Sequence, residues 1–227
     1  MKKYNDIEYK LIRRNRKTSS LIVESDGKVI VIVPESFSIE EVERLIQSKI
    51  YWIYTKIAEF EDLNNSKVNR QFRNGQGFLY LGSSYRLEIT DDTDQDLKLY
   101  RGRFYLRKSK VEDARKLFKN FYREKGVKKI EEIVNKYKRQ MGVDPKSIRI
   151  MELKNRWGSC SDEGSLNFNW KCLMAPLTII DYIVVHELAH IISKNHSEEF
   201  WNAIDKVMPD YEKKKNWLRK NGASLDI

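Results

Sequence analysis

The segment from residue 178 to residue 192 constrains the fold most, because it is almost wholly apolar and yet carries two histidines and a glutamate. A helix that is apolar nearly all round is typical of a protein core. His186, Glu187 and His190 then lie in that core, where burial of polar groups costs free energy unless they bind something. The segment is too short for a transmembrane helix. We therefore expect a globular protein built around a buried helix that carries a functional site.

The three histidines of this chain, His186, His190 and His196, all fall within the string HELAHIISKNH. Residues four apart lie about 40° apart around a helix, so the first two imidazoles reach one ion. Glu187 lies beside this pair and reaches a water on the ion rather than the ion itself. This is the zincin arrangement, with two histidine ligands and a glutamate general base on one helix. It predicts one zinc ion (Zn2+) per chain.

A third ligand requires the chain to turn after His190. Residues 193–195 are polar, and Asn195 tolerates the left-handed backbone with which chains often leave a helix. His196 then folds back to the ion. A metzincin sequence has glycine where this chain has Ser193, so the chain departs from that pattern. As in zincins that use a glutamate, two downstream acids remain alternative third ligands: Glu199 and Asp205.

The two cysteines, Cys160 and Cys172, are too few for a disulfide scaffold. The start of the chain has no apolar segment of a signal peptide, so we expect free thiols in a cytoplasmic protein. Nucleophilic catalysis by Cys160 lacks a base, because every histidine is assigned to the metal. A structural zinc would need one of these cysteines as a fourth ligand, and neither has C-x-x-C spacing.

The rest of the chain predicts an α+β fold. Strands are expected at residues 7–14, 18–24 and 28–33, with a hairpin turn at 25–27 and a helix capped by Ser38 and Glu41. Residues 64–77 are polar and predict a loop or linker. Later segments are predicted as follows: strands at 78–81, 85–90, 97–100 and 104–106, a surface turn at 91–96, a long helix at 110–141 with Gly126 as its candidate break point, a hairpin of 148–153 with 165–170, and a helix starting at Thr178 as its cap.

We therefore expect a β-rich N-terminal region with one helix at residues 1–108. A helical zincin-like part with a small antiparallel sheet is expected at 109–227, with a soft boundary that allows the two parts to pack as one compact unit. In zincins, a strand edge beside the metal pairs with the extended substrate. Residues 156–160 or 165–170 supply such an edge. The tryptophans are expected mainly in the core: Trp157, Trp170 and Trp201.

Positive charge is concentrated between Lys98 and Arg149, where 18 Lys and Arg face 6 Asp and Glu. Such a surplus attracts DNA or RNA without sequence preference. The alternative is a solvated face of a long amphipathic helix. Residues 151–227 have no basic surplus, which disfavours a phosphate substrate. The acidic turn at 91–96 lacks the carboxylate spacing of a calcium loop.

Several motifs together resemble the YgjP-like branch of the SprT-type metallopeptidases. The resemblance runs along nearly the whole chain and includes NRWGSCS at 155–161, NFNW at 167–170, VHELAH at 185–190, NHS at 195–197 and MPDY at 208–211. It implies a zinc-dependent hydrolase with the three histidines as ligands and Glu187 as the catalytic residue. The wider family includes proteases that act on DNA-associated proteins, and some YgjP-like members are labelled nucleotide pyrophosphatases.

The expected function is therefore a zinc metallopeptidase that hydrolyses polypeptides through zinc-activated water, with Glu187 as general base. The alternatives are a zinc-dependent hydrolase of nucleotides or other non-peptide substrates, and a nucleic-acid-binding module with a structural zinc. Candidate substrate-binding residues in the matched motifs are Arg156, Ser159 and Asn167. Arg156 either stabilises an oxyanion or forms a salt bridge at the edge of the core. The sequence carries no signal for an oligomeric state.

Overall fold

The computed structural model describes residues 2–24, 27–65, 70–153 and 156–227, with the backbone alone for 58–65. The chain divides into two compact units, Met1–Lys67 and Val68–Ile227. This division falls within the polar stretch predicted as a linker and differs from the boundary expected at 108/109. Within the described residues, no helix is long and apolar enough to cross a membrane.

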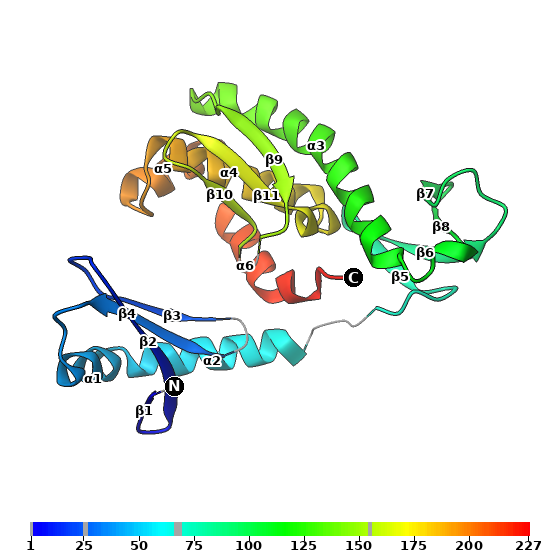
Figure 1. Cartoon of the computed structure of the whole chain (residues 1–227). Coiled ribbons are helices and arrows are strands. Elements are labelled where there is room, and N and C mark those ends of the chain that lie inside the picture. The colour runs from blue at the N-terminus through cyan, green and yellow to red at the C-terminus, as the bar shows by residue number, and fades with distance from the viewer. Residues whose placement is uncertain (1, 25–26, 66–69, 154–155) are drawn as a thin grey trace. The chain divides into compact units, whose positions relative to one another are not determined.

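The first unit is a four-stranded sheet with two helices (Figure 1). The sheet order is β1-β2-β4-β3, with β2 parallel to β4 and β3 antiparallel to β4. The predicted hairpin is confirmed by the β3–β4 pairing, although Ser25 and Asp26 of its turn lie outside the described residues. The bounds are β1 Lys2–Tyr4, β2 Ile7–Arg14, β3 Ser20–Val23, β4 Val29–Pro34, α1 Ile39–Ser48 and α2 Ile50–Asn65.

The capping box predicted at the start of α1 is confirmed. The hydroxyl of Ser38 accepts a hydrogen bond from the backbone N–H of Glu41, whose carboxylate accepts one from the backbone N–H of Ser38. Val42 and Ile46 of α1 and Ile53 of α2 are buried. Together with Val31 of β4 they form the core of this unit, which is distinct from the core of the second unit.

The second unit begins with a four-stranded sheet in the order β5-β6-β8-β7. Its bounds are β5 Gly77–Tyr80, β6 Ser83–Thr90, β7 Leu97–Tyr100 and β8 Arg103–Arg107. Phe78 of β5 and Phe104 of β8 are fully buried against Phe118, with ring centroids 4.3 Å and 4.9 Å from its own. Because Phe118 belongs to the following helix, these strands share a core with the rest of the second unit, which is why a boundary at 108/109 does not describe the packing.

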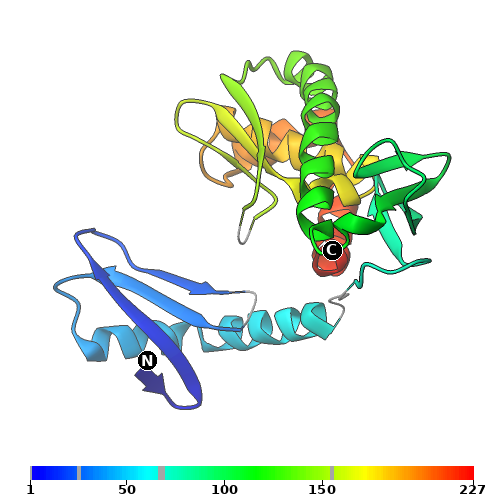
Figure 2. The ribbon, with the colours of Figure 1, turned by 45° about the vertical axis from the view of Figure 1, so that its right-hand side comes forward.

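A short 3-10 helix, Lys108–Lys110, leads into the long helix α3, Ala114–Met141. Helix α3 continues through Gly126 without a break. A Cβ at Gly126 would lie 3.0 Å from the side chain of Leu173 and 3.4 Å from that of Ile150, so glycine allows close packing here. The four-stranded sheet lies at the N-terminal end of α3, and a second sheet lies along its other part (Figures 1 and 2).

The second sheet has the order β10-β11-β9 and is mixed. Its strands are β9 Ser147–Met151, β10 Gly158–Cys160 and β11 Ser165–Asn169. The predicted hairpin of 148–153 with 165–170 is wrong, because β9 and β11 are parallel. The tight turn at Gly164 (φ 80°) instead joins β11 to β10, its antiparallel partner. Strand β10 therefore forms an edge of the sheet.

The remaining elements of the second unit are helical. They are the 3-10 helix Trp170–Met174, α4 Leu177–Ile192, α5 Glu198–Val207, α6 Tyr211–Asn221 and the 3-10 helix Gly222–Ser224. Helix α4 packs against α3, α5, α6 and β10, so its expected burial is confirmed. Its cap residue is Pro176 rather than Thr178, and no side chain caps it. The α+β fold class is confirmed, with a mixed rather than antiparallel small sheet.

Candidate metal centre

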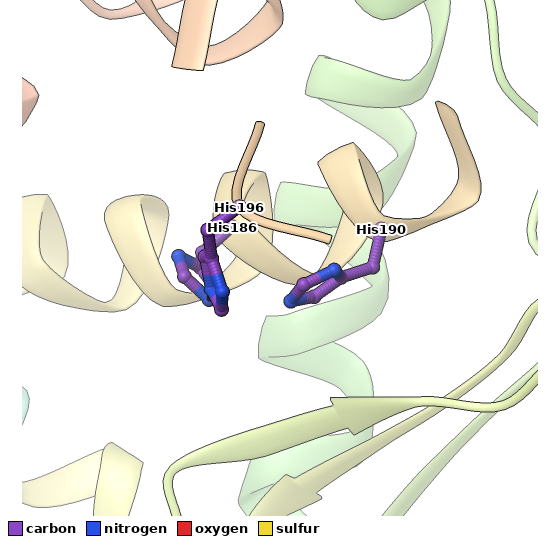
Figure 3. Close-up of side chains that lie close together, drawn as sticks. All are labelled: His186, His190 and His196. Atoms are coloured by element: carbon purple, nitrogen blue, oxygen red, sulfur yellow. Dashed lines mark hydrogen bonds between the residues drawn. The ribbon is translucent and has the colours of Figure 1, made fainter. Parts of the chain in front are cut away.

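The three histidines converge on one point. His186 and His190 lie one turn apart on α4, and His196 comes from the segment between α4 and α5 (Figure 3). One ring nitrogen from each lies within 4.8 Å of the other two. The Nε2 atoms of His186 and His196 are 3.2 Å apart. In the part of the chain that the structure describes, this is the one group of three or more His, Cys, Asp or Glu residues that converges in this way.

The turn that brings His196 back is made by an extended residue. Helix α4 ends at Ile192, and Ser193 follows with φ −137° and ψ 123°. Asn195 is not left-handed, contrary to expectation, since the described non-glycine residues with positive φ are Asn5, Leu81 and Arg101. An extended backbone is accessible to any residue, so position 193 does not require the glycine of the metzincin pattern and accommodates serine. The Ser193 carbonyl also lies 3.3 Å from Nδ1 of His190.

The ring of His196 is held by an aromatic stack. Its centroid lies 5.6 Å from that of Trp201 with the planes 28° apart, and Trp201 in turn stacks on Tyr211 at 5.3 Å and 19°. Ser197 caps α5 by accepting a hydrogen bond from the N–H of Phe200. A loop residue thereby gains a fixed orientation from the helices that follow it.

The two acids considered as alternative ligands do not join the cluster. Glu199 instead lines a different surface pocket with Asn202 and Lys206. Asp205 is exposed on α5. The convergence in the structure thus involves imidazoles alone.

The environment favours the neutral form of two of the imidazoles, those of His186 and His196. Burial, with the neighbouring imidazoles of His190 and His196, lowers the pKa of His186 to about 3. Burial also lowers the pKa of His196. Nδ1 of His186 is buried without a hydrogen-bond partner among the described residues. Neutral ring nitrogens that meet at one point are suitable ligands for a zinc ion, so the residues present fit the expected metal.

The side chain of Glu187, which belongs to α4, lies against Gly158 of β10. Its side chain is 5% exposed, and burial raises its pKa to about 8, with the Arg156 guanidinium acting in the opposite direction. A Cβ on Gly158 would lie 2.6 Å from both Cγ and Oε1 of Glu187. Glycine at this position of β10 therefore makes room for the carboxylate.

The centre opens into a pocket of about 530 Å³. Two of the predicted substrate-binding residues, Arg156 and Ser159, line it, whereas Asn167 does not. Asn167 lies opposite Ser159 on β11 and donates a hydrogen bond from Nδ2 to its Oγ at 3.3 Å. The pocket is lined by Arg156, Trp157, Gly158, Ser159, Cys160, Asp162, Tyr182, Ile183, His186, Glu187, His190, Lys194, His196 and Leu218.

Comparison with known proteins places this geometry in a family. The profile of a family described as "YgjP-like, metallopeptidase domain" matches residues 17–221. The chain belongs to the YgjP-like family. A search of curated proteins found no match.

Two solved structures resemble parts of this YgjP-like chain. The metallopeptidase zymogen abylysin of Pyrococcus abyssi is 23% identical, with a TM-score of 0.39, over 43% of this chain and 99% of its own. The metallopeptidase zymogen jannalysin of Methanocaldococcus jannaschii is also 23% identical, with a TM-score of 0.36, over 39% of this chain and 92% of its own. Likenesses of this size support no statement about activity.

Arg156 of this YgjP-like protein forms no ion pair with any described residue and is exposed at the rim of the pocket. The alternative of a salt bridge at the core edge is therefore not seen. Of the tryptophans, Trp170 is fully buried as expected, Trp157 lines the pocket and Trp201 supports His196. Burial raises the pKa of the Cys160 thiol, which does not favour a nucleophilic thiolate.

Five pocket residues were given no role in the site from the sequence: Tyr182, Ile183, Asp162, Lys194 and Leu218. Helical spacing gave a signal for the first two, because residues 182 and 183 lie one turn before His186 and Glu187 on the same face. Leu218 had no such signal, since it reaches the pocket from α6 through tertiary packing alone.

Proposed function

We propose that this YgjP-like protein is a zinc-dependent peptidase that cleaves extended polypeptides. The observation that carries the proposal is the convergence of three imidazoles beside a buried glutamate, in a pocket lined in part by the edge strand β10. The membership of a metallopeptidase family supports it.

The open edge of β10 supplies hydrogen-bonding groups for a peptide. Among the described residues, strand β10 pairs with β11 alone. The carbonyl of Trp157 and the N–H of Ser161 bond toward β11. Because backbone groups alternate in direction along an antiparallel ladder, Gly158 and Cys160 direct theirs to the open side. A substrate strand added there would lie beside Glu187, which contacts Gly158.

The acid–base chemistry falls to Glu187. The three histidines would hold a zinc ion, which would supply a water of lowered pKa and a positive charge for the developing oxyanion. The carboxylate of Glu187 would accept a proton from the attacking water and return it to the leaving amine. The guanidinium of Arg156, which forms no ion pair with any described residue, would bind a carbonyl or carboxylate of the substrate.

Metal analysis combined with a substrate screen tests this proposal. We expect about one zinc per purified chain, and little zinc in the His196→Ala variant, because one of three ligands is lost. The matched control is Asn195→Ala, which changes the neighbouring residue and removes no imidazole. Cleavage of unstructured polypeptides but not of nucleoside triphosphates is expected. Undiminished zinc in His196→Ala would assign the third ligand elsewhere, and turnover of nucleotides alone would replace the peptidase by a nucleotide hydrolase.

A further inference from the structure

Three exposed cations lie around the metal centre without an acidic partner. They are Arg156, Lys194 and Lys215, and none of them forms an ion pair with any described residue. Their neighbour Lys214, by contrast, pairs with Asp210. A cation that has no counter-charge beside a pocket attracts an anionic group of a ligand.

The fold gathers the three cations from separate segments. Arg156 lies two residues before β10, Lys194 lies two residues after the end of α4, and Lys215 belongs to α6. Because α4 packs against both β10 and α6, these segments meet around one pocket. No local pattern shows this clustering, since residues 151–227 as a whole have no basic surplus.

Two of the cations line the pocket itself. The guanidinium of Arg156 is close enough to Glu187 to oppose the rise in the pKa of its carboxyl group. Nζ of Lys194 donates a hydrogen bond to the carbonyl of Ser161 at 2.8 Å. This bond to a neutral group holds the side chain in place and leaves its charge uncompensated.

Lys215 lies over the aromatic stack that supports His196. Its Nζ is 4.3 Å from the ring centroid of Trp201, which is a cation–π contact, and Trp201 stacks on His196. Leu218, three residues further along α6, lines the pocket. Residues three apart share one face of a helix, so Lys215 lies on the face of α6 that meets the pocket.

Acidic groups do not balance these charges. Among the described residues that line the pocket, Asp162 is the single exposed acid, and Glu187 is buried. A zinc ion held by imidazoles would keep its full positive charge, because imidazole ligands are neutral. The surroundings of the pocket are therefore cationic.

We propose that the metal pocket selects acidic polypeptides, with Asp or Glu close to the scissile bond. This inference rests on the proposed peptidase function. The cations belong to three segments and contact different groups of the site, an arrangement that suits carboxylates spaced along an extended chain. Since they surround the centre, the selection holds for either direction of the bound chain. A single phosphate group is instead bound by donors that converge on one point, as at a helix N-terminus.

A binding measurement tests the selection separately from catalysis. The zinc-loaded Glu187→Gln variant is titrated at low salt with two fluorescein-labelled peptides, Ala-Glu-Ala-Glu-Ala-Ala and its counterpart with Gln in place of Glu, and followed by anisotropy. We expect about tenfold tighter binding of the Glu peptide, because each exposed ion pair contributes up to about fivefold. High salt should reduce the difference.

The two proposals fail separately in this measurement. A preference for the Glu peptide supports the selection even where the wild-type protein cleaves nothing. Equal affinities for the two peptides would overturn it even where cleavage occurs.

Removal of the three charges gives the decisive comparison. The combined substitutions Arg156→Gln, Lys194→Gln and Lys215→Gln should abolish the preference for the Glu peptide while zinc content stays unchanged. Each substitution alone should reduce the preference about threefold, which provides the test if circular dichroism shows that the combined variant does not fold. The matched control is Lys213→Gln, which removes an exposed cation about 200° around α6 from Lys215 and should keep the preference. A preference that survives in the combined variant would overturn the inference.

A cleavage profile provides the second measurement. The zinc-loaded wild-type protein digests a mixed peptide library, and mass spectrometry identifies the residues on both sides of each cleaved bond. Enrichment of Asp and Glu within about two residues of the bond, on either side, supports the inference, whereas enrichment of Lys and Arg or no charge preference contradicts it. ATP that displaces the Glu peptide and is hydrolysed by the wild-type protein would replace the acidic polypeptide by a phosphate substrate.

Discussion

Helices α3 and α4 pack against each other but differ in where their polar side chains lie, near the surface on α3 and largely shielded from water on α4. Many lysines and arginines of α3 lie near the surface, and several pair with acids, as in Lys119 with Glu152 at 2.9 Å and Lys138 with Asp144 at 2.8 Å. Helix α4 is apolar, and its His186 and Glu187 are largely shielded from water. Exposed ion pairs contribute only about 0–1 kcal/mol each.

This contrast shows that the place of a polar group says more about function than the number of such groups. The charges of α3 keep a long helix solvated, and their removal one at a time costs little. The buried groups of α4 oppose folding unless they serve a task, so their presence needs a functional reason. The predictions below test this difference, from the buried groups of α4 to the exposed ones of α3.

Glu187→Gln should have the largest effect. The amide has nearly the same shape but does not accept a proton, so hydrolysis should fall about 10²–10⁴-fold while zinc content stays unchanged. The measurements are kcat/KM on a peptide that the wild type cleaves and metal analysis of the same sample. The matched control is Glu131→Gln at an exposed position of α3, which should leave both kcat/KM and zinc content unchanged. Wild-type turnover in Glu187→Gln would refute the general-base role.

Gly158→Ala should displace the carboxylate of Glu187 by steric contact from strand β10. The added Cβ would lie 2.6 Å from Cγ of Glu187, so the side chain has to move. A displacement near 1 Å at a reacting group costs about 10²-fold in rate, and we expect that loss with zinc retained. In the Glu187→Gln background the same substitution should add little further loss, because both changes act on one group. A further 10²-fold loss there would mean that Gly158 acts independently of Glu187.

Trp201→Ala should weaken zinc binding about tenfold, since His196 loses the ring that orients it. Competition with a chromogenic chelator measures the affinity. Trp201→Phe keeps an aromatic face and should recover most of it. Equal affinities in the wild type and Trp201→Ala would show that the stack does not position the ligand.

The smallest effect is expected from changes to the exposed charges of α3. We predict weak, sequence-independent binding of DNA or RNA by the basic region between Lys98 and Arg149, with affinity that falls steeply as salt rises. Reversal of four cations to Glu should reduce this binding and leave zinc unchanged: Lys119, Arg123, Lys128 and Lys136. Fluorescence anisotropy at low salt measures it. Absence of wild-type binding at tens of micromolar protein, where non-specific binders usually register, would leave only the solvated-face interpretation.

Local patterns in the sequence determined much of this protein. The spacing of His186 and His190 depends only on helical geometry, and the burial of α4 follows from its apolar surface. The capping box at Ser38 involves residues three apart. Strands β2 and β7 were predicted with the bounds that the structure shows. Each of these features depends on neighbours along the chain, which is why a linear pattern reveals it.

Tertiary packing alone decided the rest. The parallel pairing of β9 with β11, the edge position of β10 and the close approach at Gly126 depend on residues far apart in the chain. The same holds for the pocket, where Trp157 and Leu218 meet the face of α4. Contacts of this kind arise only when separate elements pack to bury their apolar faces, and no periodicity within one element specifies its partner. The sequence by itself thus predicted the three histidines that converge and the buried glutamate beside them, whereas the fold determined the surface that a substrate would meet.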